Sequence, residues 1–158
     1  MASTRATSLF TRKRYWYHVS TTLTKRIENL VPWGGGDSVN RSPTEPAGRR
    51  ICVAPTIEQC IVAIPYHYGA DVSIYRTQNK ELAVESNNVF DAKVTDEGWL
   101  TKPTTFIKLG TLDFEDIERH FKIEHVIPEC ASSGQLLLSR KTLRWWQHAR
   151  IHRFIKTA

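Results

Sequence analysis

The 158-residue sequence lacks the features that would assign it to several familiar protein classes. No apolar run approaches the roughly 18 residues that a membrane-spanning helix needs, so a transmembrane role is excluded. It has no Gly-Lys phosphate loop, no dinucleotide-binding glycine fingerprint, no zinc-protease or hydrolase signature, and no cysteine pairs at zinc spacing. The sequence therefore predicts no resident metal and none of these common enzyme types.

Cysteine is scarce. The chain has an odd number of cysteines with no two at CxxC spacing: Cys52, Cys60 and Cys130. Cys52 and Cys60 lie in apolar stretches, where a thiol usually serves as a small buried hydrophobic group. This usage favours reduced, structural thiols and hence a reducing, cytoplasmic compartment. Residues 1–14, rich in Ser, Thr and Arg, leave organelle targeting as an alternative.

Acidic side chains are absent from both ends of the chain. Residues 1–14 carry four cations and residues 139–158 carry six, so the net charge of +6 leaves −4 for residues 15–138. Basic ends on an acidic body favour contact with nucleic acid or an acidic partner surface, and solvated tails are the alternative. We therefore expect a basic N-terminal tail (1–14), one α+β domain (15–138) and a basic, aromatic C-terminal helix (139–158).

The overall composition, 41% apolar and 24% charged residues, is that of an ordinary globular domain. Alternating, β-branched or aromatic stretches predict strands over residues 15–20, 50–54, 71–77, 82–84, 90–94, 104–112 and 136–138. Helical spacing, caps and prolines predict helices between Ser20 and Pro32, between Thr56 and Pro65, and over 113–121 and 139–155. Residues 33–50 read as a long loop. Short strands that outnumber the helices without strict alternation predict an α+β fold.

One succession of motifs is more specific. Residues 17–20 read Tyr-His-Val-Ser at the end of the first expected strand, and residues 50–60 form a strand that turns directly into a helix. Residues 74–76 read Ile-Tyr-Arg, followed by Asp91 and the segments 94–97 and 103–106. Over about residues 15–112 this order resembles the ADP-ribosyltransferase-like superfamily, nearest to its small rifampin ADP-ribosyltransferase and tRNA 2′-phosphotransferase types.

The resemblance implies a small, strongly bent mixed or antiparallel sheet with short flanking helices. It also implies that NAD is bound as a substrate and that ADP-ribose passes to a protein or nucleic-acid acceptor. His18 would hold the ribose of NAD with support from Ser20, and a catalytic acid, either Asp91 or Glu97, would face the reacting ribose. The family often carries a tyrosine on its second strand, where this chain has Cys52.

The candidate residues suit this chemistry. Breaking the nicotinamide–ribose bond creates an oxocarbenium-like centre, which a nearby carboxylate stabilises. An aromatic ring such as Tyr17 can stack on a planar group, and the Arg76 guanidinium can bind a pyrophosphate through two hydrogen bonds. The expected cofactor-binding residues are Tyr17, Ser20, Tyr75 and Arg76. Structural alternatives remain: His18 as a packed core residue, residues 75–76 as a cross-strand pair, and residues 96–98 as a turn.

The C-terminal segment interleaves cations with aromatic side chains. Lys and Arg neutralise phosphates while Trp stacks on bases, a combination suited to single-stranded nucleic acid. The residues expected to contact nucleic acid or a protein partner are Arg140, Lys141, Arg144, Trp145 and Arg150. The alternative is a helix that packs its Trp side chains on the domain. The second functional hypothesis is therefore a non-enzymatic interaction or structural protein whose basic termini bind nucleic acid or an assembly partner.

Overall fold

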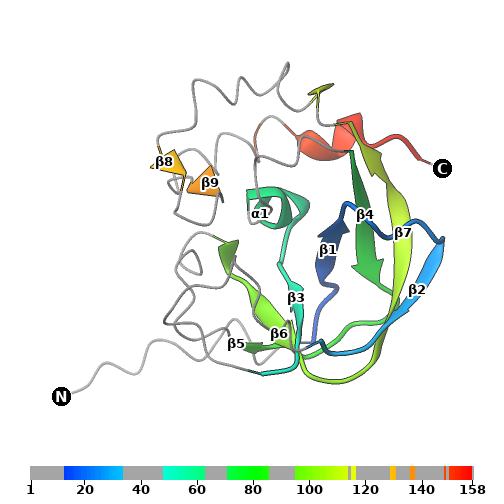
Figure 1. Ribbon diagram of the computed structural model, residues 1–158, viewed down its shortest axis with the longest axis vertical. Helices are drawn as coiled ribbons and strands as arrows, with labels where there is room; N and C mark the ends of the chain where they lie inside the picture. Colours follow the sequence, from blue (N-terminus) through cyan, green and yellow to red (C-terminus); the bar gives the residue numbers. More distant parts are fainter. Residues whose placement is uncertain are drawn as a thin grey trace.

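The computed structural model describes residues 13–33, 48–62, 71–85, 95–113, 115–116, 129–130, 136–137, 148 and 150–157. Its elements in chain order (Figure 1) are β1 (Tyr17–Ser20), β2 (Ile27–Leu30), β3 (Ile51–Val53), α1 (Ile57–Val62), β4 (Val72–Thr77), β5 (Val84–Glu85), β6 (Gly98–Leu100), β7 (Thr104–Leu112), β8 (Glu129–Cys130), β9 (Leu136–Leu137) and a 3-10 helix (Ile151–Phe154). Small antiparallel sheets with one short α-helix confirm the α+β expectation at this level. None of the helices in these ranges is long and apolar enough to cross a bilayer.

The largest sheet has the strand order β1-β4-β7-β2, and all its described pairs are antiparallel. Its centre is β4 against β7, where a bulge shifts the register between Ile74 and Tyr75. Ile74 is opposite Gly110, whereas Tyr75 is opposite Lys108. Because a bulge increases local twist, it favours the curvature that brings the edges of this sheet towards a second one.

The second sheet, β3-β6-β5, meets both edges of the first. Ala54, just after β3, pairs with Tyr17 of β1, and Arg50, just before β3, pairs with Trp33 beyond β2. Each bridge has two backbone hydrogen bonds of 2.9–3.2 Å. The four-stranded sheet is therefore strongly curved, because β1 and the chain just beyond β2 both reach the β3 segment.

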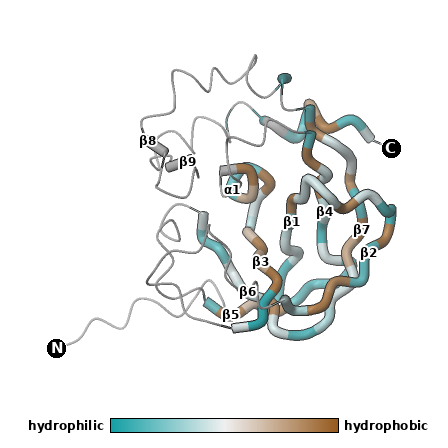
Figure 2. The backbone as a smooth tube through the Cα atoms, in the orientation of Figure 1, coloured by the Kyte–Doolittle hydropathy of each residue, from teal (hydrophilic) through white to brown (hydrophobic). Residues whose placement is uncertain are grey.

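The core lies between these strands. Trp16 is 1% exposed and donates its indole N–H to the Glu81 carbonyl at 2.8 Å. Tyr75 and Phe106 are fully buried beside it. The other members of the cluster are Ile51, Val53, Ala83 and Leu100. Hydrophobic stretches on β3, α1 and β7 are visible in Figure 2. Burying one side chain such as Phe106 contributes about 1.5–3 kcal/mol, so this cluster holds the two sheets together.

The helix α1 begins where the sequence indicates. Thr56 accepts the Gln59 backbone N–H at 3.2 Å, and its hydroxyl lies 2.8 Å from the Gln59 side-chain oxygen. This is a Thr-x-x-Gln capping arrangement. The helix packs on the outer side of β1, where the Cys60 thiol donates to the Tyr17 carbonyl. Cys52 and Cys60 are free thiols.

Three local predictions were wrong. The segment expected as a helix between Ser20 and Pro32 contains β2, which pairs with β7. Residues 98–100 were not expected to form a strand, but they form β6. A continuous helix over 139–155 is interrupted at Arg150, whose φ of 56° is left-handed. The strand expected over 90–94 and most of the helix over 113–121 lie outside the described residues.

The end of the chain packs on the domain. Lys156 exchanges two backbone hydrogen bonds of 2.9 Å with Thr111 of β7. Its ammonium group also lies 3.6 Å from a carboxylate oxygen of Asp113 and 3.7 Å from one of Asp116. Part of the C-terminal positive charge is therefore compensated by the body.

Candidate functional site

His18 lies where the pairing of β1 with β3 stops. After the single Tyr17–Ala54 bridge, the imidazole reaches across to β3, and its Nδ1 lies 2.9 Å from the Cys52 carbonyl oxygen. A carbonyl only accepts, so Nδ1 carries the hydrogen and the neutral ring presents Nε2 as an acceptor. Burial lowers the pKa of His18, opposed in part by the hydrogen bond to Cys52. A half-buried, neutral imidazole with one nitrogen fixed can accept a hydrogen bond from a hydroxyl group.

Cys52 links His18 to a carboxylate. Its side chain is on the exposed face of β3, within hydrogen-bonding reach of Glu97 and Arg50. Burial by surrounding protein atoms, then the charge and hydrogen bond of Glu97, raise the pKa of this thiol, while Arg50 lowers it. The thiol is therefore protonated at neutral pH and serves as a donor rather than as a nucleophile.

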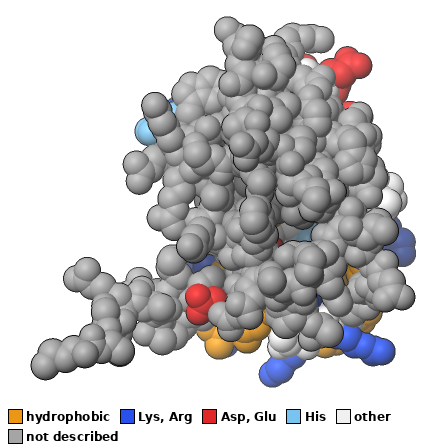
Figure 3. Space-filling view, turned by 60° about the vertical axis from the view of Figure 1, so that its left-hand side comes forward, with side chains coloured by type: hydrophobic (Ala, Val, Ile, Leu, Met, Phe, Trp, Pro, Cys, Tyr) orange, Lys and Arg blue, Asp and Glu red, His pale blue; other side chains and the backbone are white. Residues whose placement is uncertain are grey.

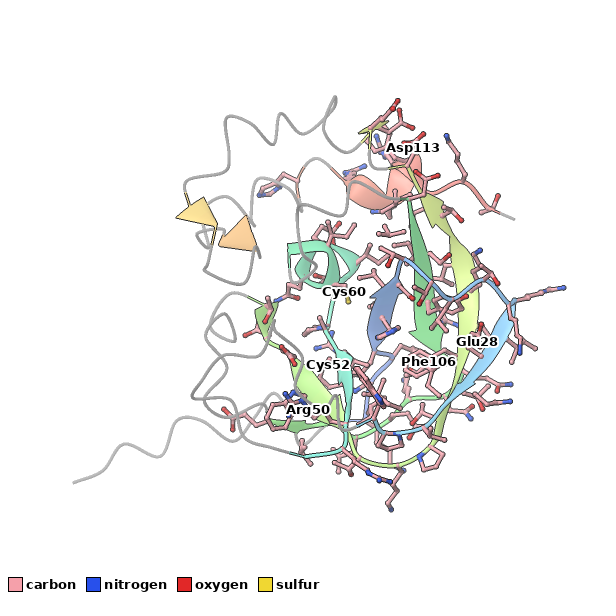
Figure 4. The ribbon with its side chains drawn as sticks, in the orientation of Figure 1. Glu28, Arg50, Cys52, Cys60, Phe106 and Asp113 are labelled. Atoms are coloured by element: carbon pink, nitrogen blue, oxygen red, sulfur yellow. The ribbon has the colours of Figure 1, made fainter. Side chains whose placement is uncertain are left out.

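Glu97 is oriented by hydrogen bonds to its near neighbours in the sequence. Its carboxylate accepts the Trp99 indole N–H at 2.8 Å, and its backbone N–H donates to the Thr95 hydroxyl at 3.3 Å. Trp99 is opposite Cys52 in the β3–β6 register, and the Arg50 guanidinium lies 4.1 Å from the centre of the Trp99 ring. In Figure 4, Cys52 and Arg50 both project from β3. Cys52 thus contacts His18 through its carbonyl oxygen and Glu97 through its thiol.

The neighbouring acid faces elsewhere. Asp96 adopts a left-handed backbone (φ 47°), and its carboxylate accepts a hydrogen bond of 2.9 Å from the Gln59 amide of α1. Asp96 is thereby directed to the helix, which leaves Glu97 as the acid beside Cys52. Asp91, the other predicted catalytic acid, lies outside the described residues.

The predicted cofactor-binding residues are not gathered on one surface. Successive side chains of a strand point to opposite faces. His18 is opposite Tyr75, and Tyr17 is opposite Arg76, so the two pairs lie on different faces of the sheet. Tyr75 is fully buried and donates its hydroxyl to the Lys25 carbonyl at 2.9 Å. Ser20 accepts the backbone N–H groups of residues 22 and 23, which stabilises the turn after β1.

A carboxylate that the sequence reasoning missed lies on the His18 face. Glu28 of β2 is opposite Phe106, whose ring centroid is 5.7 Å from that of His18. Burial, and then the charge of Glu28, raise the pKa of Tyr75. The residue was missed because its segment was interpreted as a helix. The order apolar-polar-polar-apolar of Ile27-Glu28-Asn29-Leu30 does not alternate, so no local pattern could have placed Glu28 on a strand.

Only one of the residues expected to contact nucleic acid or a protein partner lies within the described part of the chain. Arg140, Lys141, Arg144 and Trp145 lie outside the described residues, whereas Arg150 is exposed. Within the described ranges, no three His, Cys, Asp or Glu side chains gather as a metal-binding set.

Comparisons with known proteins give no relative: no family model matches the chain, and neither a curated protein nor a solved structure matches it.

Proposed function

We propose that this chain transfers ADP-ribose from NAD to a macromolecular acceptor, a protein or a nucleic acid. The observation that supports the proposal is the contact series from His18 to the Cys52 carbonyl and from the Cys52 thiol to Glu97. These are the positions at which the resemblance to ADP-ribosyltransferase-like proteins expects a ribose-holding histidine, a second-strand side chain and an acid.

Each residue has a distinct proposed role. His18 accepts a hydrogen bond from a ribose hydroxyl through Nε2, because Nδ1 is committed to Cys52. Glu97, oriented by the Trp99 indole, stabilises the positive charge that develops on the ribose as nicotinamide leaves. Cys52 donates to Glu97 from the position of the family's tyrosine.

A pair of His18 variants separates this role from a structural one. The amide nitrogen of Asn is as many bonds from Cα as the imidazole Nδ1, so His18→Asn can keep the hydrogen bond to Cys52 but loses Nε2. We expect it to melt near the wild-type temperature and to release nicotinamide from NAD at least about 100-fold more slowly. His18→Ala should lose both activity and stability.

The acid is tested in the same nicotinamide-release assay, measured with cell-extract protein and with RNA as acceptors. Glu97→Gln should reduce the rate by about 10²–10³-fold. Glu85→Gln, at an exposed position on β5, is the matched control and should retain full activity. Absence of nicotinamide release by the wild type with every acceptor, or full activity of Glu97→Gln, would reject the proposed function.

A further inference from the structure

Two cations share one aromatic ring on the face of the sheet opposite His18. The Arg76 guanidinium of β4 lies 4.4 Å from the centre of the Tyr15 ring, and the Lys80 ammonium group lies 5.8 Å from it. Tyr15 is 38% exposed and Lys80 is exposed. We call Tyr15, Arg76 and Lys80 the Tyr15 cluster.

The charge of this cluster is not compensated by the described part of the chain. Among the described residues neither Arg76 nor Lys80 takes part in a salt bridge, in contrast to Lys156. The Nε group of Arg76 is buried and has no hydrogen-bond partner there.

More positive charge surrounds the cluster. Arg14 pairs through its backbone with Glu81, next to Lys80, but its guanidinium lies 5.4 Å from the Trp16 ring centre and donates to the Pro55 carbonyl, so it does not join the cluster. Lys13, two residues before Tyr15, is exposed, so Lys13, Arg76 and Lys80 stand against the single carboxylate of Glu81 in the segments 13–17 and 76–81. Figure 3 shows Lys and Arg side chains beside hydrophobic ones along the lower edge of the molecule.

We propose that the Tyr15 cluster binds the phosphate backbone of single-stranded nucleic acid. A guanidinium binds a phosphate with two parallel hydrogen bonds, and a lysine adds a mobile second charge. The partly exposed Tyr15 ring supplies an edge against which a base can pack. This surface is separate from the His18 site, because Tyr17 and Arg76 lie on the opposite face from His18 and Tyr75. The proposal therefore does not depend on NAD chemistry.

The test is fluorescence anisotropy of a labelled 20-nucleotide single strand, as oligo-dT and oligo-U, titrated with the full chain. Each phosphate contact contributes about 0.7 to the slope of log affinity against log salt concentration, and its contribution to affinity vanishes near 1 M salt. Loss of one such contact therefore weakens binding roughly eightfold at 50 mM salt, and we expect at least this loss for Lys80→Glu. The slope of log affinity against log salt concentration should also decrease in magnitude by about 0.7 or more for this variant. Arg76→Gln should act in the same direction, with its melting temperature checked because Arg76 is half-buried.

The matched control is Lys25→Glu. Lys25 is equally an exposed lysine, but it follows β1, whereas Lys80 follows the antiparallel β4, so the two lie at opposite ends of these strands. Lys25→Glu should bind like the wild type, and so should His18→Asn. No binding by the wild type at 50 mM salt, or equal affinities of the Lys80 and Lys25 variants, would overturn the proposal. Equally tight, cluster-dependent binding to polyglutamate or to anionic vesicles would overturn it in favour of an acidic protein or a membrane surface.

Discussion

Replacing Gly110 by alanine tests how the end of the chain is attached to β7. A Cβ at Gly110 would lie 2.5 Å from the Lys156 carbonyl oxygen and would also collide with the Ile155 side chain. Cβ atoms are essentially never found within 3.0 Å of a backbone atom, so residues 155–156 must move away. The φ of +158° at Gly110 adds strain for any residue with a side chain.

The expected loss of stability follows from these contacts. Separating the segments weakens the two 2.9 Å hydrogen bonds between Thr111 and Lys156, each worth about 0.5–1.5 kcal/mol. The backbone strain adds about 1–3 kcal/mol. We therefore expect Gly110→Ala to lose about 2–6 kcal/mol, which corresponds to a fall in Tm of roughly 4–24 °C for a chain of this length.

Thermal unfolding followed by circular dichroism measures the effect, with Gly48→Ala as the matched control. A Cβ at Gly48 would meet nothing within 4 Å, so that variant should be neutral or slightly stabilised. Deleting residues 155–158 should remove the part of the Gly110→Ala penalty that comes from the collision and leave the part that comes from backbone strain. If the two glycine variants melt together, or if the Gly110→Ala penalty is as large in the shortened chain as in the full chain, the docking of residues 155–156 on β7 is incorrect.

Three further predictions concern the site and its supports. Tyr75→Phe should cost about 1 kcal/mol in chemical denaturation, because the hydroxyl bond to Lys25 is lost. The lowered pKa of His18 means that the folded state binds its proton less readily than the unfolded state, so stability should fall as pH drops below about 6.5. Denaturation midpoints at pH 7 and pH 5 should therefore differ less for His18→Asn than for the wild type. Glu97→Gln should lower the pKa of the Cys52 thiol and speed its alkylation by iodoacetamide, measured by peptide mass; an unchanged rate would contradict their contact.

The elements that are long, or that have clear start and stop signals, could be predicted from the sequence. Residues 71–77 alternate, and residues 104–112 are rich in β-branched and aromatic side chains, so both specify a strand, and β4 and β7 follow closely. Pro55 and Thr56, with Gln59 three residues after the cap, mark the start of α1. In these places the local pattern agrees with the tertiary structure.

The errors fall on short segments whose structure depends on distant partners. Ile27 to Leu30 is too short for its periodicity to separate helix from strand, and it becomes a strand because β7 pairs with it. Glu28 is opposite Phe106, which is far along the chain and gives no local signal. Likewise β6 has three residues and is fixed by its pairing with β3.

The candidate site shows the same dependence on register. His18 could be selected from its place at the end of an aromatic strand, but its contact with Cys52 arises because β1 and β3 pair at one position only. The choice of Glu97 over Asp96 follows from the Gln59 hydrogen bond, which no local pattern predicts. Tyr75 and Arg76 were assigned to one site, although adjacent residues of a strand face opposite sides.

The register of β1 against β4 governs both proposed sites. With Tyr17 opposite Arg76 and His18 opposite Tyr75, the imidazole faces the core and β3, while Arg76 faces Tyr15 on the other side. A slip of one residue would exchange the two faces, placing His18 beside Arg76 and removing its bond to Cys52. The Trp16 side chain opposes such a slip, because it is buried and donates to the Glu81 carbonyl. Substitutions at Trp16 should therefore impair NAD turnover and nucleic-acid binding together, whereas substitutions at His18 or Lys80 should impair only one.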